Sequence, residues 1–488
     1  MKHTILSLCL LVAAASAAPA LAASACEADL PDYRRSIDEG IDTTCRQAMW
    51  ADFPSFGKTI CATIPEDVDT NTYGALILKT PGTLPQLNRL FDLFSWRSFI
   101  ALTWPVDDKE RPKDTPVTEG TPWFLKWKTT TDIFGASDGV YESSEPDLRS
   151  GDTSQPDKHD LIDQNGNKVT FEIFINDPLF NYLTKNNLNV MTGQEKFFQC
   201  VRKEKGSDRD ASPLGVDLPW GSDSEAGRRR VGAVALKAAW KVLDPSKGDR
   251  PERFIRRTVK VGGKTRELGL VGMNIMRKTF RTKARWIWIA FEQVDNLEVN
   301  ELEPNLKPSF HNPKCPTCPV NVPPVPGAKP QPTQVMRVVP ISRATAQLNA
   351  EVQALFKSLY PGSPLQYYEL VGTQWPTAPA EEPTDQHELP GAITNQSGGR
   401  PNVAYLVNST IETYSQLGNQ SVDSLNVGRA GDPSDVFATS SCMGCHFTAP
   451  MIAESYPRTT TQMKTIQVPL FGGPRSADFL FMLSRRSK

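Results

Sequence analysis

The segment Cys442-Met443-Gly444-Cys445-His446 constrains the fold of this chain more than any other feature. It is the Cys-x-x-Cys-His sequence to which c-type haem is attached. Two thiols three positions apart lie on one helical turn, where they can form thioethers with the two vinyl groups of a porphyrin. The histidine that follows is then brought under the iron as its proximal ligand. The competing interpretation is a disulfide, or half of a zinc site with an incidental histidine. We therefore expect one covalent haem c, held by Cys442, Cys445 and His446.

The first residues predict export. Lys2 and His3 precede an uncharged run at positions 5–18, and Ala20-Leu21-Ala22 supplies a cleavage site of small residues. This order is typical of a Sec-type signal peptide, here residues 1–22. An uncleaved anchor is the alternative, but the run is shorter than the ~20 apolar residues that a membrane span needs. No other segment is long and apolar enough to span a membrane. Because c-type haem is attached after export, we expect a periplasmic protein.

The remaining cysteines suggest disulfides. Removal of residues 1–22, which include Cys9, leaves eight of nine cysteines. Cys315 and Cys318 form a second Cys-x-x-Cys, but Pro319 follows them, so this pair has no proximal ligand. A structural disulfide, within the pair or to another cysteine, is the main interpretation. A redox-active pair and a metal site with His311 are the alternatives. The other four cysteines would form two disulfides whose pairing the sequence leaves open: Cys26, Cys45, Cys61 and Cys200.

Hydrophobic periodicity predicts an α+β fold. An apolar stripe at helical spacing over 87–102 predicts a helix that ends before Trp104-Pro105. A second amphipathic helix is expected over 344–360. Alternating, β-branched and aromatic runs predict an antiparallel sheet from the segments 169–175, 231–242, 268–276, 286–291 and 366–375. In the run 286–291, Trp286, Trp288 and Ala290 face away from Ile287, Ile289 and Phe291, and we interpret both faces as sheet core. Two short helices are expected after Ser409 and Ser476.

A proline-rich segment divides the chain. Residues 313–332 contain eight prolines, a composition typical of an extended linker. The sequence therefore predicts a β-rich body over residues 26–312, a linker at 313–333, and a mixed, partly helical haem-binding part over 334–488.

The sequence does not determine the second axial ligand of the iron. Few residues follow His446, and Met463, in a polar segment, and Met482, on the expected last helix, are the candidate distal ligands among them. His387, in a polar loop of the same part, is a third candidate. An iron without a second protein ligand is also possible from the sequence. Two strong ligands favour electron transfer, whereas an open position favours ligand binding or oxygen chemistry.

Several segments resemble a known family. Residues 96–105 read WRSFIALTWP, residues 286–296 read WIWIAFEQVDN, and residues 408–412 read NSTIE. Together with the motif at 442–446, they resemble segments of large, poorly characterised periplasmic cytochrome c family proteins with one haem. The resemblance extends over most of the chain after the leader. It implies a haem cofactor and a periplasmic location, and no specific reaction.

The charge balance and the absence of several sequence motifs argue against some classes of function. Lys plus Arg (54) nearly balances Asp plus Glu (55), so no net field attracts nucleic acid. Walker, nucleophile-elbow and dinucleotide-binding motifs are absent from the sequence. The first hypothesis is single-electron transfer with a redox partner protein. The alternative is a haem enzyme or ligand-binding protein acting on a small molecule, such as peroxide, nitric oxide or hydroxylamine, at an open iron. A third makes the body a binding module with an accessory haem.

Overall fold

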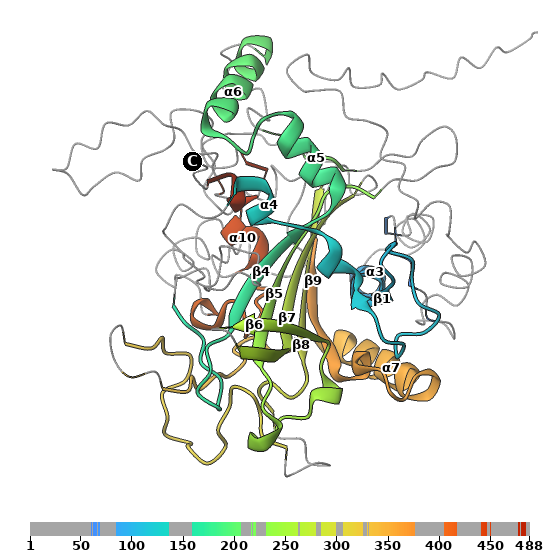
Figure 1. The fold of residues 1–488 in the computed structure, drawn as a ribbon, viewed down its shortest axis with the longest axis vertical. Helices are drawn as coiled ribbons and strands as arrows, with labels where there is room; N and C mark the ends of the chain where they lie inside the picture. Colours follow the sequence, from blue (N-terminus) through green and yellow to red (C-terminus); the bar gives the residue numbers. More distant parts are fainter. Residues whose placement is uncertain are drawn as a thin grey trace, which may run out of the picture.

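An antiparallel sheet of seven strands forms the centre of the molecule (Figure 1). Its strands lie in the order β3-β4-β5-β7-β8-β9, and β6 pairs with the first part of β7. The strands are β3 (Lys128–Thr129), β4 (Thr170–Ile175), β5 (Val234–Val242), β6 (Arg256–Val261), β7 (Lys264–Thr279), β8 (Arg285–Gln293) and β9 (Tyr368–Gln374). With helices packed on it, this sheet gives the α+β fold that the sequence predicted.

The structure is a computed structural model that describes part of the chain. The predicted leader at 1–22, His387, Met463 and the cysteines at 26, 45 and 61 lie outside the described residues. The described residues are 60, 62–65, 67–68, 84–135, 159–205, 216, 218–220, 231–261, 264–279, 285–298, 306–325, 329, 331–375, 405–416, 441–446, 449, 477–478 and 480–484.

Strand β8 shows how alternation separates the two faces of the sheet. Successive side chains of a strand point to opposite faces. Ile287, Ile289 and Phe291 join a buried cluster with α3 (Leu84–Thr103) and α7 (Arg343–Leu359). Trp286, Trp288 and Ala290 join a second buried cluster with α10 (Cys442–His446). Figure 1 shows α3 and α7 on one side of the sheet and α10 on the other. The predicted division of the two faces is confirmed.

The two long helices that cover one face agree with the predicted ranges. α3 ends at Thr103 because Pro105 cannot continue a helix. α7 begins after Ser342, whose side chain accepts a hydrogen bond from the amide of Thr345 (3.1 Å). The helices are joined to each other and to β9, because the indole of Trp96 donates to Asn349 (2.9 Å) and Asn349 donates to the carbonyl of Leu370 (2.9 Å).

Shorter elements complete the described fold. A two-stranded sheet joins β1 (Pro105–Val106) and β2 (Thr121–Pro122). The remaining α-helices are α4 (Thr130–Phe134), α5 (Asp177–Lys185) and α6 (Met191–Lys205). The 3-10 helices are η2 (Trp123–Lys126), η3 (Pro245–Lys247), η4 (Pro251–Arg253), η5 (Pro364–Tyr367), η7 (Thr413–Ser415) and η9 (Phe481–Ser484).

The sheet continues across the predicted domain boundary. β9 belongs to the part that was expected to be separate, yet it pairs with β8 over residues 288–293. The end of the proline-rich segment lies against the body, because the amide of Thr333 donates to the carbonyl of Ile162 (2.9 Å). The described residues before and after 313–333 thus share one sheet and one buried cluster.

Two short elements differ from the prediction. Asn408, and not Ser409, caps the turn at 408–412: its side-chain oxygen accepts a hydrogen bond from the Thr410 amide (3.0 Å), and Glu412 accepts one from the Asn408 amide (2.7 Å). The predicted helix is replaced by the single turn of η7, because this capping closes the chain into a tight loop. Near the C-terminus, the described residues of the predicted helix 477–486 form a turn at 477–478 followed by η9; Ser476, its predicted cap, lies outside them.

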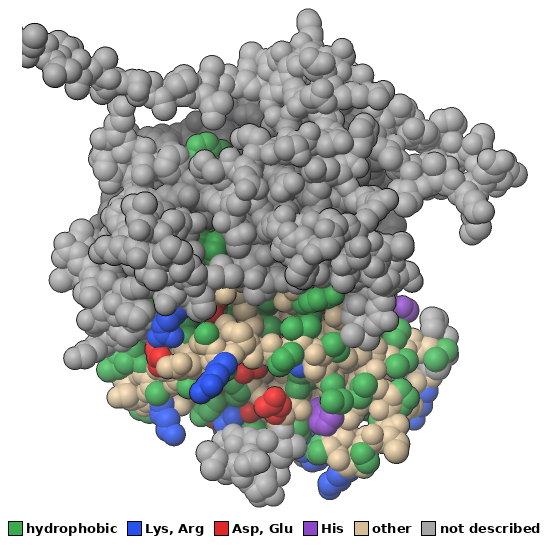
Figure 2. All heavy atoms as spheres, turned by 180° about the vertical axis from the view of Figure 1, so that it is seen from behind, with side chains coloured by type: hydrophobic (Ala, Val, Ile, Leu, Met, Phe, Trp, Pro, Cys, Tyr) green, Lys and Arg blue, Asp and Glu red, His purple; other side chains and the backbone are tan. Residues whose placement is uncertain are grey.

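The described surface carries both signs of charge. In the view of Figure 2, basic and acidic side chains lie interspersed with apolar ones over the described part of this face. Among the described residues, no helix has the length and apolar character needed to cross a membrane.

Candidate functional site

The Cys-x-x-Cys-His motif forms a single helical turn, α10, that is held by its backbone. The amide of Cys442 donates to the carbonyl of Leu406 (3.0 Å), and the amide of Met443 donates to the side-chain oxygen of Gln374 (2.8 Å). Gln374 is the last residue of β9, and Leu406 lies over Gly372 of the same strand. The edge strand of the sheet therefore fixes where the motif begins.

Neither thiol of the motif forms a disulfide. Cys442 is buried and its sulfur donates to the Leu406 carbonyl (3.2 Å), whereas Cys445 is exposed. Burial and then the charge of Glu412 raise the pKa of the Cys442 thiol. The surrounding chain desolvates the Cys445 thiol and raises its pKa to about 11, although its side chain reaches the surface. Because reactive redox thiols need a lowered pKa, this environment does not favour dithiol redox chemistry.

Aromatic side chains flank the histidine of the motif. The ring of His446 lies 4.8 Å from the ring of Trp288 and 5.2 Å from that of Phe481, measured between centroids. Trp288 extends from β8, and Phe481 begins η9. The chain before η9 is attached to the sheet by Asp478, which pairs with Lys278 and accepts a hydrogen bond from the indole of Trp286 (3.1 Å). The imidazole is thus oriented by elements distant in sequence.

A strip of polar side chains crosses the sheet face beside the motif. Lys237 of β5 pairs in register with Asn274 of β7, which pairs with Ala290 of β8. Lys237 and Asn274 are partly exposed, in contrast to the buried residues before and after them on their strands. Ala290 lies two positions after Trp288 on the same face of β8. The strip is therefore adjacent to the tryptophan that contacts His446.

Glu412 lies over this strip. One of its oxygens accepts a hydrogen bond from Asn274 (2.6 Å), and the other accepts one from the amide of Asn408 (2.7 Å). Desolvation raises the pKa of Glu412 to about 7, and the nearby charge of Lys237 opposes this shift. The carboxyl group can therefore change its charge near neutral pH.

One of the three candidate distal ligands lies within the described residues. Met482 is 4 % exposed and lies in the same buried cluster as α10, but Phe481, the residue before it, makes the contact with His446. Met463 and His387 lie outside the described residues. Among the described residues, no group of three or more His, Cys, Asp or Glu side chains is placed to hold a metal ion.

The second Cys-x-x-Cys segment, unlike the first, contains a disulfide. Cys315 and Cys318 form a disulfide with each other, one of the two pairings that the sequence allowed. The metal site with His311 is excluded here, because both sulfurs are bonded and the His311 ring interacts with the Val335 carbonyl (3.2 Å). Cys200 is also disulfide-bonded.

The side chains at 442–446 fit a covalently attached haem. Two thiols that form no disulfide lie on one turn of helix, and an imidazole follows them directly. The exposed Cys445 and the partly exposed His446 leave one side of the motif accessible, next to the partly exposed strip. Thioether formation would use both thiols, and the histidine nitrogen would bind the iron.

Sequence reasoning missed the neighbours of the motif. Alternation along β8 placed Trp288 on one face, but the side chain was interpreted as ordinary core. Lys237, Asn274 and Glu412 approach one another through strand register and the turn at 408–412, and a single sequence has no local signal for such pairing. The resemblance of NSTIE to the family segment was the one available hint at Glu412.

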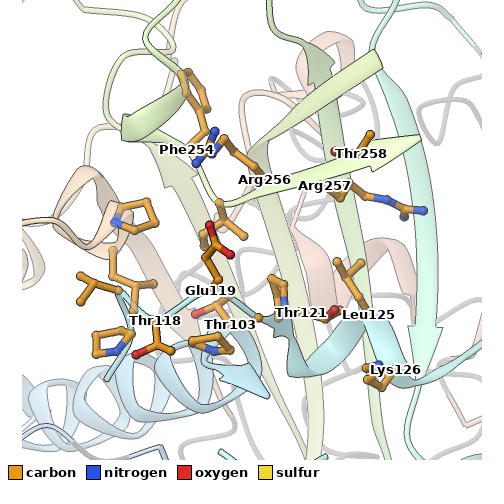
Figure 3. A pocket seen from close by; sticks show the side chains of 18 of the residues that line it. Thr103, Thr118, Glu119, Thr121, Leu125, Lys126, Phe254, Arg256, Arg257 and Thr258 are labelled. Atoms are coloured by element: carbon orange, nitrogen blue, oxygen red, sulfur yellow. The ribbon is translucent and has the colours of Figure 1, made fainter. Parts of the chain in front are cut away.

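The body contains a separate cleft of about 980 Å³ on the other face of the sheet (Figure 3). Glu172 and Phe174 of β4 line it, and they alternate with Ile173 and Ile175, which pack on the side of α10. Figure 3 shows Glu119 directed across the cleft towards the strand that carries Arg256. The cleft and the motif are therefore on opposite faces of the sheet.

Comparison with models of protein families, with curated proteins and with solved structures found no match for this chain.

Proposed function

We propose that this chain is an exported, periplasmic c-type cytochrome with one haem, which transfers single electrons to or from a redox partner protein. The supporting observation is that Cys442 and Cys445 lie on one helical turn without forming a disulfide and are followed directly by His446, whose ring contacts two aromatic rings. A haem bound there supplies an iron that accepts and releases one electron.

The described side chains would orient the haem ligand His446. They would not carry the electron themselves. Trp288 and Phe481 hold the plane of the His446 ring, and Leu406 with Gln374 holds the start of α10. A ligand whose orientation is fixed in advance needs little rearrangement when the iron changes its charge. The exposed position of Cys445 supports electron transfer, because it leaves one edge of the site open to a partner.

A second function is favoured by the polar strip. Lys237, Asn274 and Glu412 lie beside the motif and are partly exposed. Glu412, with its pKa of about 7, could donate a proton to a small molecule, and Lys237 and Asn274 could orient it. Met482, the candidate distal ligand within the described residues, is buried in the apolar cluster. The alternative is therefore a haem enzyme or ligand-binding protein for peroxide, nitric oxide or hydroxylamine at an open iron.

Visible spectra test both functions. The full chain is expressed with a cytochrome c maturation system, and ferric and ferrous spectra are recorded with and without carbon monoxide. Electron transfer predicts low-spin spectra in both states that carbon monoxide leaves unchanged. Met463→Ala and Met482→Ala then identify the second ligand by its loss. A high-spin spectrum that shifts with carbon monoxide would favour the alternative, and a mature protein without covalent haem would contradict both.

A further inference from the structure

The carboxyl group of Glu412 is held in a rigid position beside α10. Asn274 donates to one oxygen (2.6 Å) and the backbone of Asn408 donates to the other (2.7 Å). The side chain of Asn408 in turn donates to Asn274 (3.1 Å) and to the carbonyl of Phe291 (2.9 Å). Two strands of the sheet and the turn at 408–412 therefore determine where the charge of Glu412 lies.

The turn that carries Glu412 is itself fixed to the sheet. Ser409 donates its amide to Glu292 (2.6 Å), a fully buried residue of β8, and also donates its hydroxyl to the same carboxylate. The turn approaches β7 so closely that a Cβ atom on Gly272 would lie 2.1 Å from the hydroxyl oxygen of Thr410. Glycine at this position permits the approach. The contacts of this turn with the buried core of the sheet therefore fix the position of the Glu412 carboxylate.

Glu412 and Lys237 lie next to the motif through the sheet. Both neighbour Asn274, Glu412 by a hydrogen bond (2.6 Å) and Lys237 by strand register. Asn274 pairs with Ala290, two positions after the tryptophan whose ring lies 4.8 Å from that of His446. The charged groups that act on Glu412 are Lys237 of β5 and Glu292 of β8. Glu292 is itself paired with Arg337 (3.1 Å), whereas Lys237 lies on the partly exposed strip beside the motif.

We propose that Glu412 and Lys237 are positioning charges that set the reduction potential of the haem held at Cys442 and Cys445, Glu412 lowering it and Lys237 raising it. The inference rests on the proposed function. A ferric haem carries one more positive charge than a ferrous one, so a nearby carboxylate stabilises the oxidised state. A single charge about 10 Å away in partly buried surroundings changes such an equilibrium on the order of tenfold.

The test is a spectroelectrochemical titration of the haem-loaded full chain. Glu412→Gln keeps the shape of the side chain and one of its two hydrogen-bond acceptors but removes its charge. At pH 9, where the wild-type carboxyl is ionised, this variant is expected to favour the reduced state about tenfold more than the wild type. For a one-electron couple this is a rise of about 59 mV. At pH 5, where the carboxyl is protonated, the two proteins should have similar potentials.

Two further variants separate charge from structure. Lys237→Gln is expected to shift the potential in the opposite direction, to lower values, which a general loosening of the fold would not produce. Glu369→Gln is the matched control. Burial also raises the pKa of Glu369 to about 7. Glu369, however, lies on the edge strand β9 and is paired with Arg337 (2.9 Å). Its potential should follow that of the wild type at both pH values.

The outcomes distinguish the two proposals. A wild-type protein without covalent haem contradicts the proposed function, and with it this inference. Covalent haem with a potential that Glu412→Gln and Lys237→Gln leave unchanged, or shift in the same direction, overturns the inference alone. If Glu412→Gln fails to accumulate, the shift in Lys237→Gln alone decides it: Lys237 is partly exposed, so we expect this variant to keep the core of the sheet packed. Opposite shifts with an unchanged Glu369→Gln support it.

Discussion

Cys315 and Cys318 have the same spacing as Cys442 and Cys445, but the structure gives the two pairs different states. The first pair lies between prolines on the surface and forms a disulfide. The second lies on a helical turn against the sheet, and neither of its thiols forms a disulfide. The second pair also has an imidazole next to it and aromatic rings around that imidazole. The comparison teaches that the surroundings, and not the spacing, decide what a Cys-x-x-Cys segment can bind.

The strongest test of this comparison removes each pair in turn. Cys442→Ser with Cys445→Ser is expected to abolish covalent haem completely, because no thioether can form. Cys315→Ser with Cys318→Ser should retain it. The measurement is the intact mass of the denatured protein after expression with a cytochrome c maturation system. Covalent haem that persists in the first double variant would remove the distinction between the pairs.

The aromatic support of His446 is the next difference to test. Trp288→Ala should lower the free energy of unfolding by about 3–5 kcal/mol, because a buried tryptophan leaves a cavity. It should also alter the visible spectrum of the bound haem, because the imidazole loses its neighbour. Denaturant unfolding and absorption spectra measure the two effects. Trp123→Ala is the control, because Trp123 is buried and its ring packs edge-to-face against that of Trp127: the variant should destabilise the fold and leave the spectrum unchanged.

The second pair should also be sensitive to pH through the edge strand that holds it. Burial raises the pKa of Asp92 from 3.8 to about 6, and Asp92 accepts a hydrogen bond from Thr373 (2.7 Å), the neighbour of Gln374. A raised pKa means that the stability contributed by protonated Asp92 is complete below pH 3.8 and is lost as the pH rises through about 6. The loss amounts to about 3 kcal/mol.

Asp92→Asn measures this contribution directly. We expect the free energy of unfolding of the variant to vary less than that of the wild type between pH 4 and pH 7. Urea unfolding at several pH values is the measurement. Equal pH profiles of the two proteins would show that Asp92 does not titrate in this range.

The disulfide of the first pair should contribute least to stability. A link between residues three positions apart closes a very short loop, for which the loss of chain entropy in the unfolded state is worth about 2 kcal/mol or less. Cys315→Ala with Cys318→Ala should therefore lower the free energy of unfolding only slightly. The same denaturant titration measures it. A loss as large as that of Trp288→Ala would mean that this loop is part of the core.

Local pattern predicted the elements of the core better than their assembly. α3, β5, β7 and β8 lie within a few residues of their expected ranges, because each has an apolar period of its own. β6 was missed because its sequence, rich in Arg and Lys, has no continuous apolar face, and it is a strand only by pairing with β7. α5 was also missed, although Asn176 caps it and a proline lies in its first turn.

The candidate site was predictable at the motif and not around it. Cys442, Cys445 and His446 follow one another in the chain, so their proximity needs no knowledge of the fold. Trp288 and Glu412 reach the motif through the register of β8 and through a turn that depends on Gly272. The boundary at 313–333 illustrates the same limit, because prolines indicate extended chain but do not show whether a later strand returns to the same sheet.

The return of β9 to the sheet bears on what happens when synthesis of the chain stops early. A chain that ends before residue 368 leaves the edge of β8 unpaired along residues 288–293. If the chain ends before α7, Ile289 and Phe291 also lose the cover that α7 and β9 provide. An exposed apolar edge with unpaired backbone groups is a template for aggregation. Incomplete chains of this protein would thus associate edge to edge, and only a chain that extends through β9 protects its own sheet from such polymerisation.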